Sequence, residues 1–134
     1  MRVLAVDFGG KRIGIAVGES DPRVVSPRQN IDASGTLAKD AEAIRAVFEK
    51  EQADMVVIGL PQDEGGETKM SRVCRKLGEC LTALGVEVNY VDESLTSAEA
   101  ERDMTEAGLK GSERRKRSDG EAACRILERF FDEV

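Results

Sequence analysis

The sequence predicts an α/β domain built on a mixed five-stranded sheet with helices on its faces. Two β-branched apolar runs joined by glycines open the chain, as in a hairpin. Two later apolar runs are short and continuous, which is typical of buried parallel strands, and the stretches between them carry apolar residues at helical spacing. The 134 residues suffice for one sizeable core, so we expect residues 1–134 to form a single domain.

The first three strands are expected to be antiparallel. Residues 2–8 and 12–18 are joined by Gly9-Gly10-Lys11, which favours a hairpin whose glycine takes a positive φ. A third strand is predicted over 23–29. Since Pro27 within it cannot donate a ladder hydrogen bond, we expect this strand at the edge of the sheet.

The rest of the chain alternates helices and strands. Each predicted helix has an apolar stripe between charged faces, and Gly85 stands where a helix C-cap would be. The predicted elements are a helix over 35–51, a strand over 55–61 followed by a glycine-containing loop, a helix over 67–84, a strand over 86–91, a helix over 97–107, a polar loop over 109–118 and a last helix beginning at Ser118-Asp119.

The composition restricts the available chemistry. The chain has no histidine, so the usual general base at neutral pH and the commonest transition-metal ligand are missing. Cys74, Cys80 and Cys124 show no close Cys-x-x-Cys pairing, and we expect reduced thiols in place of a zinc site. Any catalysis must therefore use carboxylates.

Hydropathy and charge bear on location and partners. No apolar stretch approaches the roughly 18 to 20 residues that span a bilayer, and the first residues lack the order of a signal peptide. We expect a cytoplasmic protein with no membrane partner. The net charge of -6 argues mildly against nucleic-acid binding by the protein as a whole, but it leaves local basic patches open.

Acidic residues lie at the ends of three predicted elements. Asp7 interrupts a buried strand, Asp92-Glu93 follow the last strand, and Asp119 opens the last helix. Each has a structural alternative. Asp7 would cap the glycine turn, Asp92-Glu93 would be a solvated strand end or would cap the next helix with Asp92 or Ser94, and Asp119 would cap the last helix. The predicted topology brings all three to one sheet edge, where open α/β proteins bind ligands. Converging carboxylates suit Mg²⁺ or Mn²⁺, which could support hydrolysis of a phosphodiester.

A basic cluster immediately precedes Asp119. It consists of Lys110, Arg114, Arg115, Lys116 and Arg117. We interpret it as a loop that contacts phosphate, and the alternative is a solvated loop. With one Tyr and four Phe available for base stacking, we expect recognition of nucleic-acid shape more than of sequence.

The chain resembles the YqgF/RuvX family, relatives of RuvC in the RNase H-like superfamily. Four stretches carry the resemblance, in family order and across essentially the whole chain: VDFGGKRIGIAVG, VVIGLP, VDESLTSAEAE and SDGEAACRIL. The sequence departs from the family pattern at Ser94, where Arg is common, and at Gly10, where Thr or another residue is common.

The resemblance implies an RNase H-like fold and a metal-dependent nuclease. Its substrate would be Holliday junction DNA or the 5′ end of precursor 16S rRNA. By the same analogy Asp7, Glu93 and Asp119 are the catalytic residues and the ligands of Mg²⁺ or Mn²⁺, with Glu93 preferred over Asp92. Lys11 and Arg12, after the glycine turn, are expected to meet phosphate.

Other interpretations stay open at this stage. DFGGKRIGIAVG also resembles the phosphate-binding hairpin of actin-like ATPases and sugar kinases, but these enzymes close two lobes around ATP and 134 residues supply one. A non-catalytic rRNA-binding assembly factor is the other alternative. A resolvase that cuts two strands symmetrically would be a two-fold homodimer, whereas an RNA-processing nuclease could act as a monomer.

Overall fold

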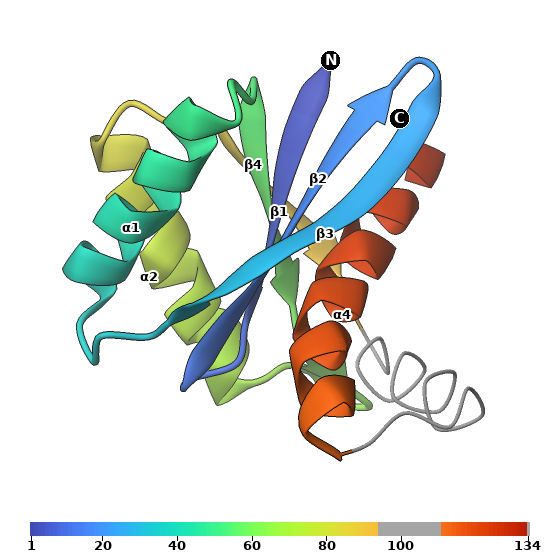
Figure 1. The fold of residues 1–134 in the computed structure, drawn as a ribbon. Helices are drawn as coiled ribbons and strands as arrows, with labels where there is room; N and C mark the ends of the chain where they lie inside the picture. Colours follow the sequence, from blue (N-terminus) through green and yellow to red (C-terminus); the bar gives the residue numbers. More distant parts are fainter. Residues whose placement is uncertain (94–110, 134) are drawn as a thin grey trace.

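Five strands form a mixed sheet in the order β3-β2-β1-β4-β7 (Figure 1). The computed structural model describes residues 1–93 and 111–133, and for residues 111–119 it describes the backbone alone. β1, β2 and β3 are antiparallel, whereas β4 and β7 run parallel to β1. The predicted sheet and the edge position of the third strand are confirmed. The strands are β1 (Arg2–Phe8), β2 (Arg12–Ser20), β3 (Arg23–Asp32), β4 (Met55–Leu60) and β7 (Val88–Asp92).

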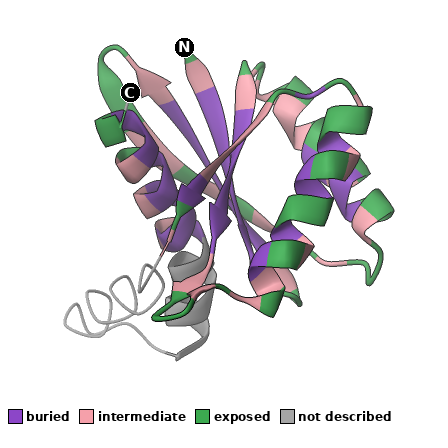
Figure 2. Ribbon diagram, turned by 180° about the vertical axis from the view of Figure 1, so that it is seen from behind, coloured by how far each residue is buried: buried purple, intermediate pink, exposed green. Residues whose placement is uncertain are grey.

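Helices cover both faces of the sheet, as Figure 1 shows. The helices α1 (Leu37–Lys50) and α2 (Lys69–Ala83) pack on one face, and α4 (Gly111–Glu133) packs on the other. The buried surfaces of all three helices point toward the strands between them (Figure 2). Within the described ranges no helix is long and apolar enough to cross a membrane.

The alternation of side chains along β1 builds a separate core on each face. Leu4, Val6 and Phe8 belong to the core under α1 and α2, and Val3 and Ala5 belong to the core under α4. The next residue in the second series is Asp7. The strand therefore directs this carboxyl group toward the α4 face, among residues that are fully buried.

Two glycines adopt the backbone conformations that the sequence predicts. Gly10, at φ +91°, makes the turn between β1 and β2, and the Gly9 amide donates to the Arg12 carbonyl at 3.0 Å. Gly85, at φ +87°, follows the end of α2. At the other end of α2, Thr68 and Ser71 form a capping box.

The last helix begins earlier than predicted. α4 starts at Gly111, so the basic residues 114–117 lie on its first turns and the predicted polar loop is wrong for residues 111–117. Glu, Lys and Arg are good helix formers, and this propensity extends the helix beyond the apolar stripe used to predict it. A small hairpin, β5 (Gln62–Asp63) and β6 (Gly66–Glu67), occupies the predicted glycine loop. The helix predicted over 97–107 lies outside the described residues.

Candidate active site

The structure brings Asp7 and Glu93 together on the α4 face of the sheet. Asp7 lies near the carboxyl end of β1, and Glu93 follows β7, where its amide donates to the Leu60 carbonyl at 3.1 Å. The two carboxyl groups share a hydrogen bond. The turn after β1 is closed by the backbone hydrogen bond from the Gly9 amide to the Arg12 carbonyl, so it does not require the Asp7 side chain as a cap.

Gly59 on β4 makes room for the Glu93 carboxyl group. A Cβ atom at Gly59 would lie 2.7 Å from Glu93 Cδ and Oε2, and 2.5 Å from Ile126 Cδ1 of α4. Real Cβ atoms essentially never make nonbonded contacts this short. Glycine at this strand position therefore allows the Glu93 carboxyl group to lie directly on the backbone of β4.

Burial and the neighbouring acid favour a protonated Glu93. Desolvation, the charge of Asp7 and the hydrogen bond to Asp7 raise the pKa of Glu93 to about 9, and the Arg129 guanidinium acts in the opposite direction. At neutral pH a proton is thus held between the two carboxyl groups. Glu93 Oε2 is buried and has no hydrogen-bond partner among the described residues.

Asp92 lies apart from this pair. Its side chain is exposed, and Gln62 Nε2 donates to its Oδ1 at 3.1 Å. Its carbonyl oxygen accepts a hydrogen bond from Arg129 Nη1 on α4. The geometry therefore pairs Glu93 with Asp7 and directs Asp92 elsewhere.

Asp119 lies on α4, two turns after Gly111. The expectation that it opens the last helix is wrong, and with it the alternative that it caps that helix. The Asp119 side chain lies outside the part of the chain that the structure describes, so Asp119 enters the site only as a backbone position on α4. Among the side chains that are described, no group of three acidic or Cys residues is placed to hold a metal ion.

The predicted nucleic-acid contacts lie on two elements. Lys11 is exposed in the turn after β1, and Arg12 is half-buried at the start of β2. Residues 114–117 lie on the first turns of α4 as backbone positions, and Lys110 is outside the described residues.

Two residues of the site were missed by sequence reasoning. Gly59 had a usable signal, since a glycine within an apolar strand often marks a close approach to the backbone. Arg129 had none, because one cation among the charges of an amphipathic helix is ordinary. Its position near Glu93 follows from the packing of α4 across the sheet.

The buried cysteines add no nucleophile to the site. Burial raises the pKa of the Cys74 thiol to about 12, with smaller effects from Glu93 and Asp7. Burial also raises the pKa of Cys124 to about 12. Both remain neutral thiols at physiological pH, as expected for reduced packing residues, and all three cysteines are free.

Replacing Gly59 with Ala should displace Glu93 and abolish the activity of the site. Gly18→Ala is the matched control, because its Cβ would lie 2.9 Å from Phe131 in the same α4 core without approaching either carboxyl group. We expect both variants to lower the melting temperature, measured calorimetrically, since both overpack the core. Only Gly59→Ala should lose activity per folded molecule; equal losses in both variants would contradict the role of Gly59.

Solved structures share this fold. Thermus thermophilus RuvC matches with a TM-score of 0.56 and 13% identity, over 99% of this chain and 96% of that one. The same protein, in complex with a Holliday junction substrate, matches with a TM-score of 0.59 and 11% identity over the same shares. A ROK family protein from Streptococcus pneumoniae shares the fold at a TM-score of 0.52 and 14% identity, but this chain covers 40% of it. The protein thus has an RNase H-like fold, which is the fold of a class of nucleases.

The chain belongs to the RuvX family, described as Holliday junction resolvase, whose model matches residues 1–133. A relative from Methylobacillus flagellatus is 38% identical over 97% of this chain and 90% of its own length. One from Nitratidesulfovibrio vulgaris is 39% identical over 98% of this chain and 93% of its own length. Both are named "Putative pre-16S rRNA nuclease". Family and fold together place the protein among the RNase H-like nucleases.

Proposed function

We propose that the protein is a metal-dependent nuclease that hydrolyses phosphodiester bonds of structured nucleic acid, with Asp7, Glu93 and Asp119 as its catalytic residues. The observation that carries this proposal is the hydrogen-bonded pair of Asp7 and Glu93 on one face of the sheet. Two carboxyl groups held together in a largely buried position are costly unless a proton or a cation lies between them.

The donor set fits Mg²⁺ or Mn²⁺. Both carboxyl groups provide hard oxygen ligands, and Glu93 Oε2 is a buried acceptor without a hydrogen-bond partner among the described residues. A bound divalent ion would supply Lewis-acid chemistry, activating water and stabilising the leaving oxygen of the phosphodiester. Asp7 and Glu93 would hold the ion after their shared proton has left.

Asp119 is proposed as the third ligand from its position along α4. It precedes Ala122, Ala123 and Ile126 at helical spacing; all three are buried, and Ala123 and Ile126 belong to the core between α4 and the sheet. The helical register along α4 therefore supports Asp119 as a further residue of this site. Arg129, nearer the C-terminal end of the same helix, donates a hydrogen bond to the Asp92 carbonyl and so supports the position of Glu93.

The basic residues of α4 are proposed to hold the nucleic-acid backbone. The helix macrodipole gives no reason for cations near a helix N-terminus, since it favours acidic residues there. Four cations at 114–117 in a chain of net charge -6 therefore point to an anionic partner.

Replacing Arg114, Arg115 and Arg117 together with Ala should weaken nucleic-acid binding and flatten its salt dependence. Each lost phosphate contact should reduce the slope of log K against log salt by about 1. Arg45→Ala on α1, whose guanidinium pairs with Glu49, serves as the control. An unchanged slope in the triple variant, measured by fluorescence anisotropy across a salt series, would reject these residues as contacts.

Two substrates agree with the proposal. The relatives' names suggest the 5′ end of precursor 16S rRNA, and the family description suggests four-way DNA junctions. A homodimer is proposed for the second case only, because symmetric cleavage of two strands needs two related sites. Both substrates would be met in the cytoplasm of a bacterium.

The deciding experiment is cleavage of both substrates by the full chain with Mg²⁺ or Mn²⁺. We expect the parent protein to cleave at least one of them and to lose this activity with EDTA. Binding of precursor rRNA without cleavage under any of these conditions would instead favour the non-catalytic assembly factor. ATP turnover without nuclease activity would favour the actin-like alternative.

A further inference from the structure

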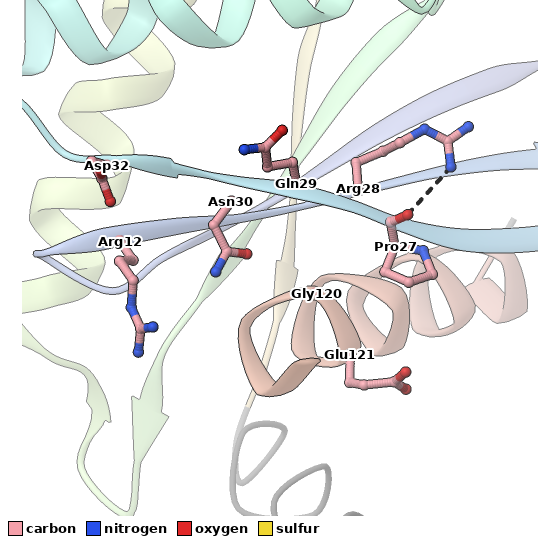
Figure 3. A pocket seen from close by; sticks show the side chains of 8 residues that line it. All are labelled: Arg12, Pro27, Arg28, Gln29, Asn30, Asp32, Gly120 and Glu121. Atoms are coloured by element: carbon pink, nitrogen blue, oxygen red, sulfur yellow. Dashed lines mark hydrogen bonds between the residues drawn. The ribbon is translucent and has the colours of Figure 1, made fainter. Parts of the chain in front are cut away.

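A groove of about 430 Å³ lies between β3 and α4 and is lined mostly by polar and charged residues (Figure 3). Its lining includes Arg12, Asn30, Asp32 and Glu121. None of these residues belongs to the carboxylate pair. The volume falls within the range of small-ligand sites, roughly 300 to 1,000 Å³.

Two local irregularities shape the groove. Pairing between β2 and β3 shifts after Ile13, so that β3 carries an extra residue opposite Gly14. This bulge turns Asn30 toward α4, whereas Gln29 extends to the other side of the strand (Figure 3). At Pro27, before the bulge in β3, α4 approaches the strand closely, since a Cβ at Gly120 would lie 2.9 Å from Pro27 Cβ.

The register places the groove next to Asp7. Asp7 pairs with Gly14 across β1 and β2, and Arg12 lies two residues from Gly14 on the same face. Asn30 is in the bulge beside Gly14. The distance from β1 to β3 is two strand spacings, about 10 Å, which a nucleic-acid strand covers in a few nucleotides. Gly14, which has no side chain, therefore lies between the groove and the pair of Asp7 and Glu93.

The lining contains carboxylates as well as cations, so its chemistry does not suit a site for a phosphate group alone. Arg28 also borders the groove, but its guanidinium is bound to Glu51 at 3.0 Å and to Ser26 at 2.8 Å. The described lining thus carries two cations, Arg12 and Arg28, and two carboxylates, Asp32 and Glu121, so it has no excess of positive charge. A mixture of N–H donors and oxygen acceptors instead complements a base edge or a sugar hydroxyl.

We propose that this groove binds one unpaired nucleotide of the substrate strand, close to the phosphate at Asp7 and Glu93. Arg12 contacts the phosphate of that nucleotide, and the Asn30 carboxamide contacts its base or its sugar. This inference rests on the proposed nuclease function and adds the substrate feature that the site selects, namely an unstacked nucleotide close to the cleavage position.

The test combines protein variants with single lesions in the nucleic acid. A fluorescent RNA with the sequence around the 5′ end of 16S rRNA is bound to the full chain in Ca²⁺, which takes oxygen ligands in looser geometry than Mg²⁺. One abasic nucleotide is moved along the strand. At one position we expect about 5-fold weaker binding to the parent, the value of one hydrogen bond, and no further loss with Asn30→Ala. Arg45→Ala serves as the surface control.

The outcomes separate the groove from the nuclease function. Coupling between Asn30 and the abasic nucleotide assigns the base as the contact, and coupling with a single 2′-deoxy nucleotide assigns the sugar; either supports the proposal. Parent protein that cleaves but shows no coupling at any position overturns the groove alone. Parent protein that neither binds nor cleaves overturns both. Equal melting temperatures of Asn30→Ala and the parent check that local unfolding is not the cause.

Discussion

Asp7→Asn should abolish cleavage and leave the fold intact. The substitution keeps the size and a hydrogen-bonding capacity toward Glu93, but it removes the charge that would hold a divalent ion. Since losing even an outer-shell partner of a metal costs about 10- to 100-fold in affinity or activity, we expect a loss of more than about 100-fold. The measurement is the rate of cleavage of the better substrate in Mn²⁺ under single-turnover conditions.

The matched control for Asp7→Asn is Asp21→Asn, exposed in the turn between β2 and β3, at the end of the sheet opposite Asp7. It carries the same chemical change at a distance from the paired carboxyl groups. We expect cleavage at the parental rate. Equal activity of Asp7→Asn and the parent would remove Asp7 from catalysis and leave it a structural residue of the β1 end.

Glu93→Gln should stabilise the metal-free protein at neutral and alkaline pH. The folded protein keeps the Glu93 proton up to about pH 9, whereas the unfolded chain releases it near the ordinary value of 4.5. The contribution of this proton to the free energy of unfolding is therefore fully present below pH 4.5. It decreases by about 1.4 kcal/mol per pH unit as the pH rises toward 9. Gln cannot ionise, and its amide donates to Asp7 as the protonated acid does. We expect a gain on the order of 3 kcal/mol at neutral pH.

This gain is measured by urea unfolding in EDTA across a pH series. The parent should lose stability from pH 5 to pH 9, and Glu93→Gln should show a flatter profile. Glu42→Gln, exposed on α1, should follow the parent. A variant less stable than the parent at every pH would show that Glu93 is ionised in the folded protein. Activity should be lost in Glu93→Gln despite its greater stability, which is common where function requires paired charges.

The sheet could be predicted because its signals are local. The Gly9-Gly10 turn, the helical stripes and the apolar run 55–61 each depend on neighbouring residues, and the five strands of the sheet, α1 and α2 lie within a few residues of their predicted places. The start of α4 could not be predicted in this way. Its first turns carry no apolar stripe, and helix propensity alone is a weak signal against a charged loop.

The site was predictable in part. Asp7 stood out because a charge in a buried strand is costly, and Asp92-Glu93 stood out because the pair follows a buried strand. The choice of Glu93 over Asp92 came from the family resemblance. Their contact depends on the parallel pairing of β4 between β1 and β7 and on the missing side chain at Gly59, which are long-range features. The bulge that turns Asn30 toward α4 is likewise a property of strand pairing and has no local signal in the sequence.

The central claim is that Asp7 and Glu93 exchange a shared proton for a divalent cation. Calorimetric titration of the full chain with Mn²⁺ at neutral pH, in two buffers of different ionisation enthalpy, tests it most directly. We predict binding with release of about one proton, and no binding by Asp7→Asn. Failure of the parent to bind Mn²⁺ or Mg²⁺ even with nucleic acid present, or binding that Asp7→Asn leaves unchanged, would contradict the claim.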